Sequence, residues 1–129
     1  MTMRVSPTAL AEVLIIEPDV YADERGFLVQ SFSEQRFAEA GLPSQFVLDN
    51  HSHSVRGVMR GLHFQLRRPQ GKLITAIAGE IFDVAVDIRV GSPTFGQWTA
   101  TTLRASAPQY IRIPPGFAHG VGGLSALAC

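Results

Sequence analysis

The clearest signal for the fold is one alternating stretch, which reads Gly79-Glu80-Ile81-Phe82-Asp83-Val84-Ala85-Val86-Asp87-Ile88. Every even position from 82 to 88 is apolar, whereas two odd positions carry Asp83 and Asp87, so a strand places the two sets on opposite faces. Gly79-Glu80 predicts a tight hairpin from a preceding strand at 72–78. We expect the aspartates to face water or to pair with the arginines of residues 56–68, and not to act as acids.

Other short stretches of strand character lie on both sides of this one and are separated by turns that contain Gly or Pro. The predicted strands cover residues 13–16, 27–32, 58–64, 98–103, 110–113 and 117 onward. One short helix is predicted at 34–40, because Ser33 can cap its start and Gly41 can end it. Many short strands with a single helix predict an all-β fold: an antiparallel sandwich, a jelly roll or a small barrel.

Composition narrows the class of protein. The 129 residues, 46% of them hydrophobic, suit one domain over residues 1–129 with a buried core. Eleven basic and eleven acidic residues cancel, so no overall charge favours nucleic acid or a membrane surface. The single cysteine, Cys129, excludes an internal disulfide and suits a reducing compartment. Without a signal-peptide pattern or a membrane-spanning apolar run, we expect a cytoplasmic protein.

Chemically active side chains are concentrated between Asp49 and Lys72, a segment with three of the four histidines. His63 follows Arg60 by three residues in an apolar strand. If neighbouring strands direct these side chains and Lys72 into one barrel mouth, they suit proton removal beside a carbonyl. Histidine, with an ordinary pKa of about 6.5, can take the proton, and a lysine can stabilise the enolate oxygen. Arg25 and Arg60 are candidates to hold an anionic group, because guanidinium matches phosphate geometry.

Two other interpretations of these histidines stay open. A histidine in an apolar strand is more often a satisfied core or interface residue than a catalyst. Histidines on barrel strands can also hold iron or zinc. Metal-binding cupins usually present His-x-His followed by Glu, however, and no Glu closely follows His51-Ser52-His53. We therefore expect no metal.

Seven short motifs follow one another along the chain between about Val13 and His119. They are Asp23-Glu24-Arg25-Gly26-Phe27, Asp49-Asn50-His51-Ser52, Arg60-Gly61-Leu62-His63-Phe64-Gln65, Gly71-Lys72-Leu73, Gly79-Glu80-Ile81-Phe82-Asp83-Val84-Ala85-Val86-Asp87-Ile88-Arg89, Gly91-Ser92-Pro93-Thr94-Phe95-Gly96 and Pro115-Gly116-Phe117-Ala118-His119-Gly120. In this order they resemble the dTDP-4-dehydrorhamnose 3,5-epimerase family. Seven ordered motifs make the resemblance specific.

The resemblance implies a cupin-type jelly roll of antiparallel strands with one short helix. It implies a homodimer that needs no cofactor and inverts C3 and C5 of dTDP-4-dehydro-6-deoxy-D-glucose, on the way to dTDP-L-rhamnose. By motif, His63 resembles the base and Lys72 the group that stabilises the enolate. Residues that bind the dTDP-sugar are implied at Arg25, Gln30, Asn50, Arg60 and His119.

The sequence also departs from the family pattern. Gln30 stands where the family usually has Glu, and Leu48 where it usually has Gln. The family continues through a segment with a general-acid tyrosine and an acid that pairs with the base, and neither Tyr21 nor Tyr110 matches that motif. The expectation is therefore a C-terminally truncated member, and loss of one general acid costs about 10²–10⁴-fold in rate. The alternatives are an impaired sugar-nucleotide-binding relative, a 3-epimerase, or a jelly roll with a vestigial site.

Overall fold

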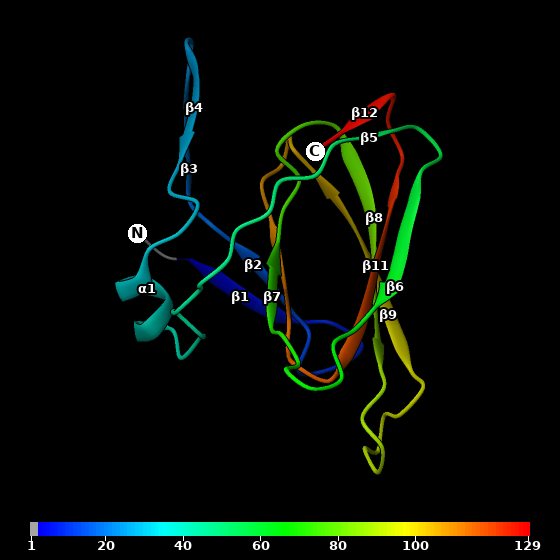
Figure 1. The fold of residues 1–129 in the computed structure, drawn as a ribbon. Coiled ribbons are helices and arrows are strands. Elements are labelled where there is room, and N and C mark those ends of the chain that lie inside the picture. Colours follow the sequence, from blue (N-terminus) through cyan, green and yellow to red (C-terminus); the bar gives the residue numbers. More distant parts are fainter. Residues whose placement is uncertain (1–2) are drawn as a thin grey trace.

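The computed structural model describes residues 3–129, which form two four-stranded antiparallel sheets (Figure 1). The first sheet has the order β1 (Arg4–Pro7), β2 (Leu14–Glu17), β10 (Tyr110–Ile113) and β7 (Lys72–Ile74). The second has the order β6 (Met59–His63), β11 (Phe117–Gly123), β8 (Glu80–Asp87) and β9 (Trp98–Arg104). Together with the structural relatives described below, this arrangement confirms the predicted all-β jelly roll.

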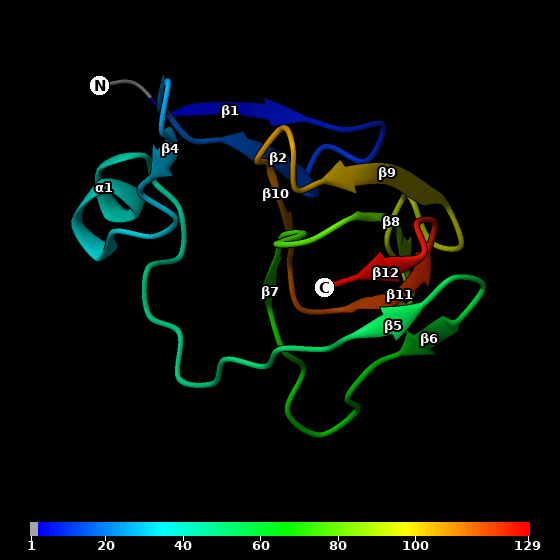
Figure 2. The same cartoon turned by 90° about the horizontal axis from the view of Figure 1, so that it is seen from above.

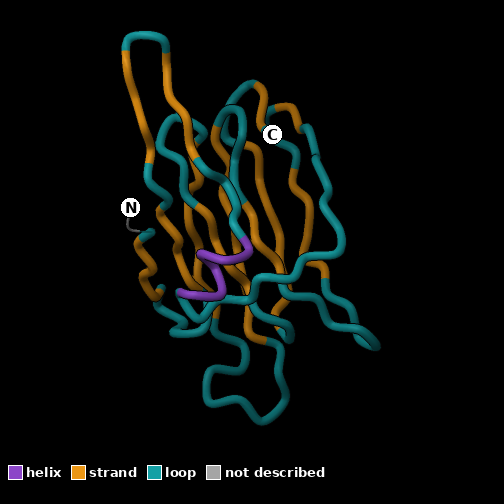
Figure 3. Tube along the Cα trace, turned by 90° about the vertical axis from the view of Figure 1, so that its left-hand side faces the viewer, coloured by secondary structure: helices purple, strands orange, loops and turns teal. Residues whose placement is uncertain are grey.

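Two smaller strand pairs complete the fold. The strands β3 (Val20–Asp23) and β4 (Gly26–Val29) form a hairpin that projects from the body of the molecule (Figures 1 and 3). The strands β5 (Ser54–Val55) and β12 (Leu127–Ala128) pair at one end of the sandwich. No helix among residues 3–129 has the length and apolar character needed to cross a membrane.

The main core fills the space between the two sheets. Ile111 and Ile113 of β10 are buried there, and Ala85 of β8 and Leu103 of β9 meet them from the second sheet. Full burial of a side chain such as Ile or Leu contributes about 1.5–3 kcal/mol to the free energy of unfolding. This core therefore identifies the inner face of each strand, which decides where the polar side chains of the site point.

The predicted alternation in β8 is present, but the buried face is the opposite of the one expected. Ile81, Asp83, Ala85 and Asp87 are buried, whereas Phe82 is 40% exposed. The prediction that the aspartates face water or pair with arginines of residues 56–68 was wrong. Both carboxylates find partners inside the protein, described below, and these partners offset much of the cost of removing a charge from water.

The prediction of a hairpin at Gly79-Glu80 was also wrong. The strand β7 pairs with β10 in the first sheet, and β8 pairs with β11 and β9 in the second. The chain leaves β7 after three residues and crosses between the sheets before β8 begins. A turn of Gly and Glu fits such a crossing as well as a hairpin, because its local sequence does not specify the partner of the strand that follows.

The helix prediction is confirmed. Helix α1 covers Glu34–Glu39, and the Arg36 backbone N–H donates to Ser33 Oγ at 3.3 Å. Phe37 of the helix is buried with Ile16 and Tyr110 on the outer side of the first sheet. The sequence analysis missed four strands, β1, β3, β5 and β12. Its strand at 27–32 is the shorter β4, because the chain turns away toward α1 after Val29.

Candidate functional site

An open pocket of about 550 Å³ lies beside β6 and β11. The side chains that line it include Arg60 and His63 of β6 and His119 of β11. Ser52, which precedes β5, closes one side. These strands bring three of the residues expected from the sequence into one cavity. The sequence analysis expected Lys72 in the same cavity as Arg60 and His63, but Lys72 is not among the residues that line it.

The register of β6 and β11 explains how these side chains meet. His63 and His119 are directly opposite one another, so both side chains lie on the same face of the sheet. A bulge follows, after which Arg60 is opposite Val121. Residues three apart on a regular strand face opposite ways, and the extra residue in β6 corrects this, so that Arg60 joins His63 on the pocket side.

Glycine makes the bulge possible. Gly61 has a φ of +140°, and a Cβ built on it would lie 2.4 Å from the Cα of Gly120. No larger residue fits between two backbones at that distance. Glycine at position 61 is therefore required by the shape of the pocket wall.

The same face continues across β8, where Ala85 is opposite His119 and Asp83 is opposite Val121. Asp83 is 0% exposed, and its Oδ2 lies 2.7 Å from His119 Nε2. Its Oδ1 is buried without a hydrogen-bond partner among residues 3–129. Burial raises the pKa of Asp83, while the hydrogen bond and charge of His119 and the charge of Lys72 act to lower it. The sequence analysis named Asp83 but gave it no role in the site; its only signal there is a carboxylate in an otherwise mostly apolar strand.

Lys72 approaches from the other sheet. It is opposite Ile113 in the pairing of β7 and β10, and Ile113 packs in the core between the sheets. Opposite residues share a face, so Lys72 points inward. Burial lowers the pKa of Lys72, and the negative charge of Asp83 acts in the opposite direction. The lysine thus faces a buried carboxylate that also binds His119.

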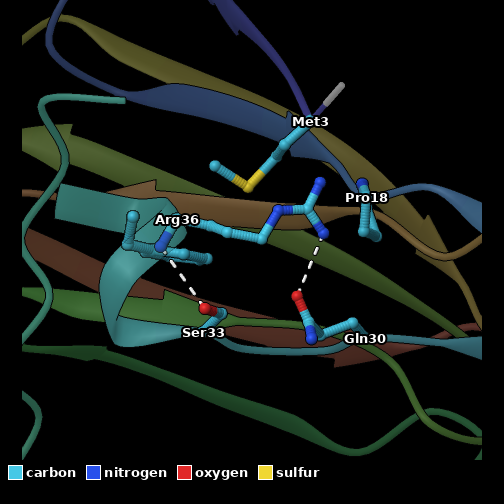
Figure 4. Close-up of a pocket in the computed structure, with 6 residues that line it drawn as sticks. Met3, Pro18, Gln30, Ser33 and Arg36 are labelled. Carbon is cyan, nitrogen blue, oxygen red and sulfur yellow. Dashed lines mark hydrogen bonds between the residues drawn. The ribbon is translucent and has the colours of Figure 1, made fainter. Parts of the chain in front are cut away.

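Three of the expected substrate-binding residues do not line this pocket. Arg25 lies at the tip of the β3–β4 hairpin, where its Nη2 lies 2.6 Å from Asp23 Oδ2. Gln30 accepts a hydrogen bond from Arg36 at 3.0 Å in a separate small hollow (Figure 4). Asn50 is exposed in the extended segment 43–53, which runs from α1 to β5 (Figure 2). Figures 1 and 2 both show the hairpin on the other side of the molecule from β6.

No group of three His, Cys, Asp or Glu side chains in the described part of the chain could hold a metal ion. His53, in the His-x-His pair, instead places its Nδ1 3.1 Å from Cys129 Sγ. Within residues 3–129, no hydrogen bond reaches the His63 ring, and Asp83 binds His119 instead.

The chain was compared with the sequence models of known protein families. The sequence model of the dTDP-4-dehydrorhamnose 3,5-epimerase family matches residues 7–128. The chain belongs to this family. It is therefore a member of a group of isomerases, and the resemblance based on the seven motifs is confirmed.

Individual relatives of the chain are epimerases of the same family. The dTDP-4-dehydrorhamnose 3,5-epimerase of Pseudomonas aeruginosa is 52% identical over 127 residues, which cover 98% of this chain and 70% of the relative. A dTDP-4-dehydrorhamnose 3-epimerase of Streptomyces niveus is 42% identical over 125 residues, or 95% of this chain and 60% of the relative. The chain thus spans between three fifths and seven tenths of these two epimerases.

A solved structure confirms the fold. The dTDP-6-deoxy-D-glucose-3,5-epimerase of Legionella pneumophila, in complex with dTDP-4-keto-L-rhamnose, superposes with a TM-score of 0.94 at 52% identity. The match covers 98% of this chain and 68% of the Legionella chain. This epimerase therefore shares the two-sheet architecture in which β6 and β11 form the wall of the pocket.

Proposed function

We propose that this chain epimerises C3 and C5 of dTDP-4-dehydro-6-deoxy-D-glucose, with His63 as the base and Lys72 as the enolate stabiliser. The observation that carries the proposal is the pairing of His63 with His119 at the wall of the pocket. Lys72 lies on the inner face of the other sheet, within reach of the charge of Asp83, which binds His119. Membership of the epimerase family supports the reaction class.

The chemistry requires a base beside an acidic C–H bond. His63 takes the proton from the carbon next to the C4 ketone, the C–H electron pair forms a C=C bond, and the carbonyl π pair moves onto the C4 oxygen. Lys72 then faces the resulting enolate oxygen, and an ammonium placed where charge develops lowers the barrier. Inversion is completed when a proton returns to the same carbon from the other face of the ring.

Arg60 is proposed to bind the substrate from the pocket wall. Its Nε donates to Ser54 Oγ at 2.9 Å and its Nη2 to the His53 carbonyl at 3.1 Å, so two contacts hold the guanidinium beside β5. Guanidinium donors that stay unoccupied can meet hydroxyl or phosphate oxygens of a sugar nucleotide. His119 and Asn50 are proposed as further contacts.

Arg25 and Gln30 enter the proposal through a homodimer. Their hairpin projects from the body and exposes the apolar side chains of Val20, Tyr21, Phe27 and Leu28. Contiguous exposed apolar surface commonly marks a protein interface. We propose that the hairpin packs on a second copy, where Arg25 and Gln30 meet the nucleotide diphosphate. A cytoplasmic location, consistent with the single cysteine, is part of the same proposal.

The experiment that tests the catalytic proposal follows solvent deuterium. The chain is incubated with the dTDP-keto sugar in D₂O, and NMR records deuterium at C3 and C5. We expect exchange at both positions in the wild type and its loss in His63→Ala. His53→Ala is the matched control, because that ring lies outside the pocket lining. Exchange that persists in His63→Ala excludes His63 as the base.

A 3-epimerase is the second candidate function, favoured by the relative of that name at 42% identity. The same spectra separate the two candidates, since a 3-epimerase incorporates deuterium at C3 alone. A sugar-nucleotide-binding relative with little turnover would bind dTDP and incorporate deuterium at neither carbon. The dimer is tested separately by light scattering, in which Leu28→Asp is expected to shift the mass toward the monomer.

A further inference from the structure

Asp83 is unusual among the charged residues of this chain, because it is fully buried and only half satisfied. One carboxylate oxygen binds His119 at 2.7 Å, and the other has no hydrogen-bond partner in the described part of the chain. Replacing a buried ion pair with apolar residues is often neutral or even stabilising. A carboxylate in this position is therefore poorly explained by stability alone, and it lies directly behind a residue that lines the pocket.

We propose that Asp83 is a positioning residue of the epimerisation site, which fixes the proton on one nitrogen of His119 and acts as the counter-ion that keeps Lys72 protonated. The inference rests on the function proposed above and deepens it. Asp83 itself does not line the pocket; it acts through one neighbour on β11 and one on β7.

The first half of the inference concerns His119. An ionised carboxylate can only accept a hydrogen bond, so His119 Nε2 must carry the proton that it shares with Asp83 Oδ2. The neutral ring then has its lone pair on Nδ1, the nitrogen that remains for a ligand. A carboxylate behind an imidazole sets both its tautomer and its orientation in this way. His119 therefore presents a defined acceptor beside His63.

The second half concerns Lys72. Burial lowers the pKa of its ammonium, and a neutral amine would stabilise an enolate poorly. The inner face of the second sheet, opposite Lys72, carries Asp83 together with His119 and His63. On its own sheet, Arg112 is opposite Leu73, which faces the helix side. Asp83 is thus the negative charge that keeps the lysine ionised.

The strand itself supplies a matched control. Asp87 lies four residues further along β8, on the same buried face, and is 0% exposed like Asp83. Its carboxylate binds Arg89, Ser92 and Thr94 and does not line the pocket. Asp83→Asn and Asp87→Asn therefore remove the same buried charge from the same strand at two different places.

The test compares the two variants with the wild type. Activity is measured as kcat and KM across pH, and folding by thermal denaturation. We expect Asp83→Asn to lose about 10–100-fold in kcat, the size of loss seen when a carboxylate that orients a metal-binding histidine is removed, with KM little changed. The alkaline limb of its kcat profile should move to lower pH, because Lys72 loses its counter-ion. Asp87→Asn should melt at a lower temperature and keep the wild-type kcat per folded molecule.

Two results would overturn the inference. One is an Asp83→Asn variant with wild-type kcat and an unchanged pH profile. The other is a loss of activity that only follows the loss of folded protein, as in Asp87→Asn. If the wild type itself shows no exchange, the proposed function fails. In that case ¹⁵N NMR of His119 in the free protein tests separately whether Asp83 fixes the proton on His119. A proton held on Nε2 in the wild type and shared between both nitrogens in Asp83→Asn supports the role in orientation, whereas identical spectra refute it.

Discussion

Asp83 and Asp87 occupy equivalent positions on one strand, and their surroundings differ sharply. Asp87 Oδ2 accepts hydrogen bonds from Arg89 Nη2 at 2.9 Å, Ser92 Oγ at 2.6 Å and Thr94 Oγ1 at 2.5 Å. Its Oδ1 accepts from Arg89 Nε at 3.0 Å and from the Arg89 backbone N–H at 2.9 Å. These donors hold the pKa of Asp87 far below its ordinary range, with the Arg89 guanidinium as the largest cause.

The Asp83 carboxylate has one hydrogen bond where Asp87 has five. Burial consequently dominates, and the pKa of Asp83 is raised. The comparison teaches that burial alone does not separate a structural acid from a functional one. A network that satisfies every lone pair stabilises the ion, whereas an ion left partly unsatisfied beside a pocket is retained for what it does to its neighbours.

The largest expected effect separates the two acids by stability. Asp87→Ala should lower the free energy of unfolding by about 3 kcal/mol, near the lower end for a broken buried ion pair, because Arg89 remains partly in contact with solvent. Asp83→Ala should cost less, since it removes one hydrogen bond and an ion that burial already disfavours. Urea denaturation measures both. Equal losses of unfolding free energy in the two variants would contradict the distinction between the surroundings of Asp83 and Asp87.

A second prediction separates Asp87, outside the pocket, from Arg60, in its wall, by ligand binding. Binding of dTDP to the folded chain should raise its stability by about 2.7 kcal/mol at a ligand concentration 100 times Kd. The increase should be the same in Asp87→Asn, whose side chain is outside the pocket, and smaller in Arg60→Ala, which loses a pocket cation. Thermal shift assays provide the measurement. Absence of any shift at millimolar dTDP in the wild type would refute dTDP binding.

The smallest expected effect is in the pH dependence of stability. The folded pKa of Asp87 is lowered, so its stabilising contribution is present above the ordinary value of 3.8 and is lost as the pH falls below it. The folded pKa of Asp83 is raised, so its ionisation reduces stability as the pH rises from 3.8 through the folded value. Asp87→Asn should therefore flatten the acid loss of stability, and Asp83→Asn should steepen the rise of stability with pH. Urea denaturation between pH 3 and 7 measures how the free energy of unfolding of each variant changes with pH. If both substitutions changed this pH dependence in the same direction, the opposite pKa shifts given to Asp83 and Asp87 would be wrong.

Local sequence was sufficient for the elements with short-range causes. Ser33 and Gly41 delimit α1 because capping depends on neighbours within one turn. The alternation of β8 is visible because side chains on a strand change face at every residue. The seven motifs identify the family, and with it the jelly roll and the reaction class, because their order carries far more information than any single spacing.

The candidate site was predictable only in part. Arg60 and His63 were recognised from one strand, but a regular strand would have pointed them to opposite faces, and only the bulge at Gly61 directs both into the pocket. The partner of His119 was missed, since Asp83 is 36 residues away along the chain. Arg25 belongs to the same set of motifs, yet it lies in the turn of the β3–β4 hairpin and not in the pocket with His63.

By itself, therefore, the sequence determined that this chain is an all-β member of the epimerase family, and it named His63, Lys72 and Arg60 as candidates for its chemistry. Tertiary structure alone decided which face of β8 is buried, which sheet receives β7, and which acid lies behind His119. The physical reason is that a period of two is identical for both faces of a strand. Burial of one face depends on partners such as Arg89 and His119, and those partners meet it only when the sheets have formed.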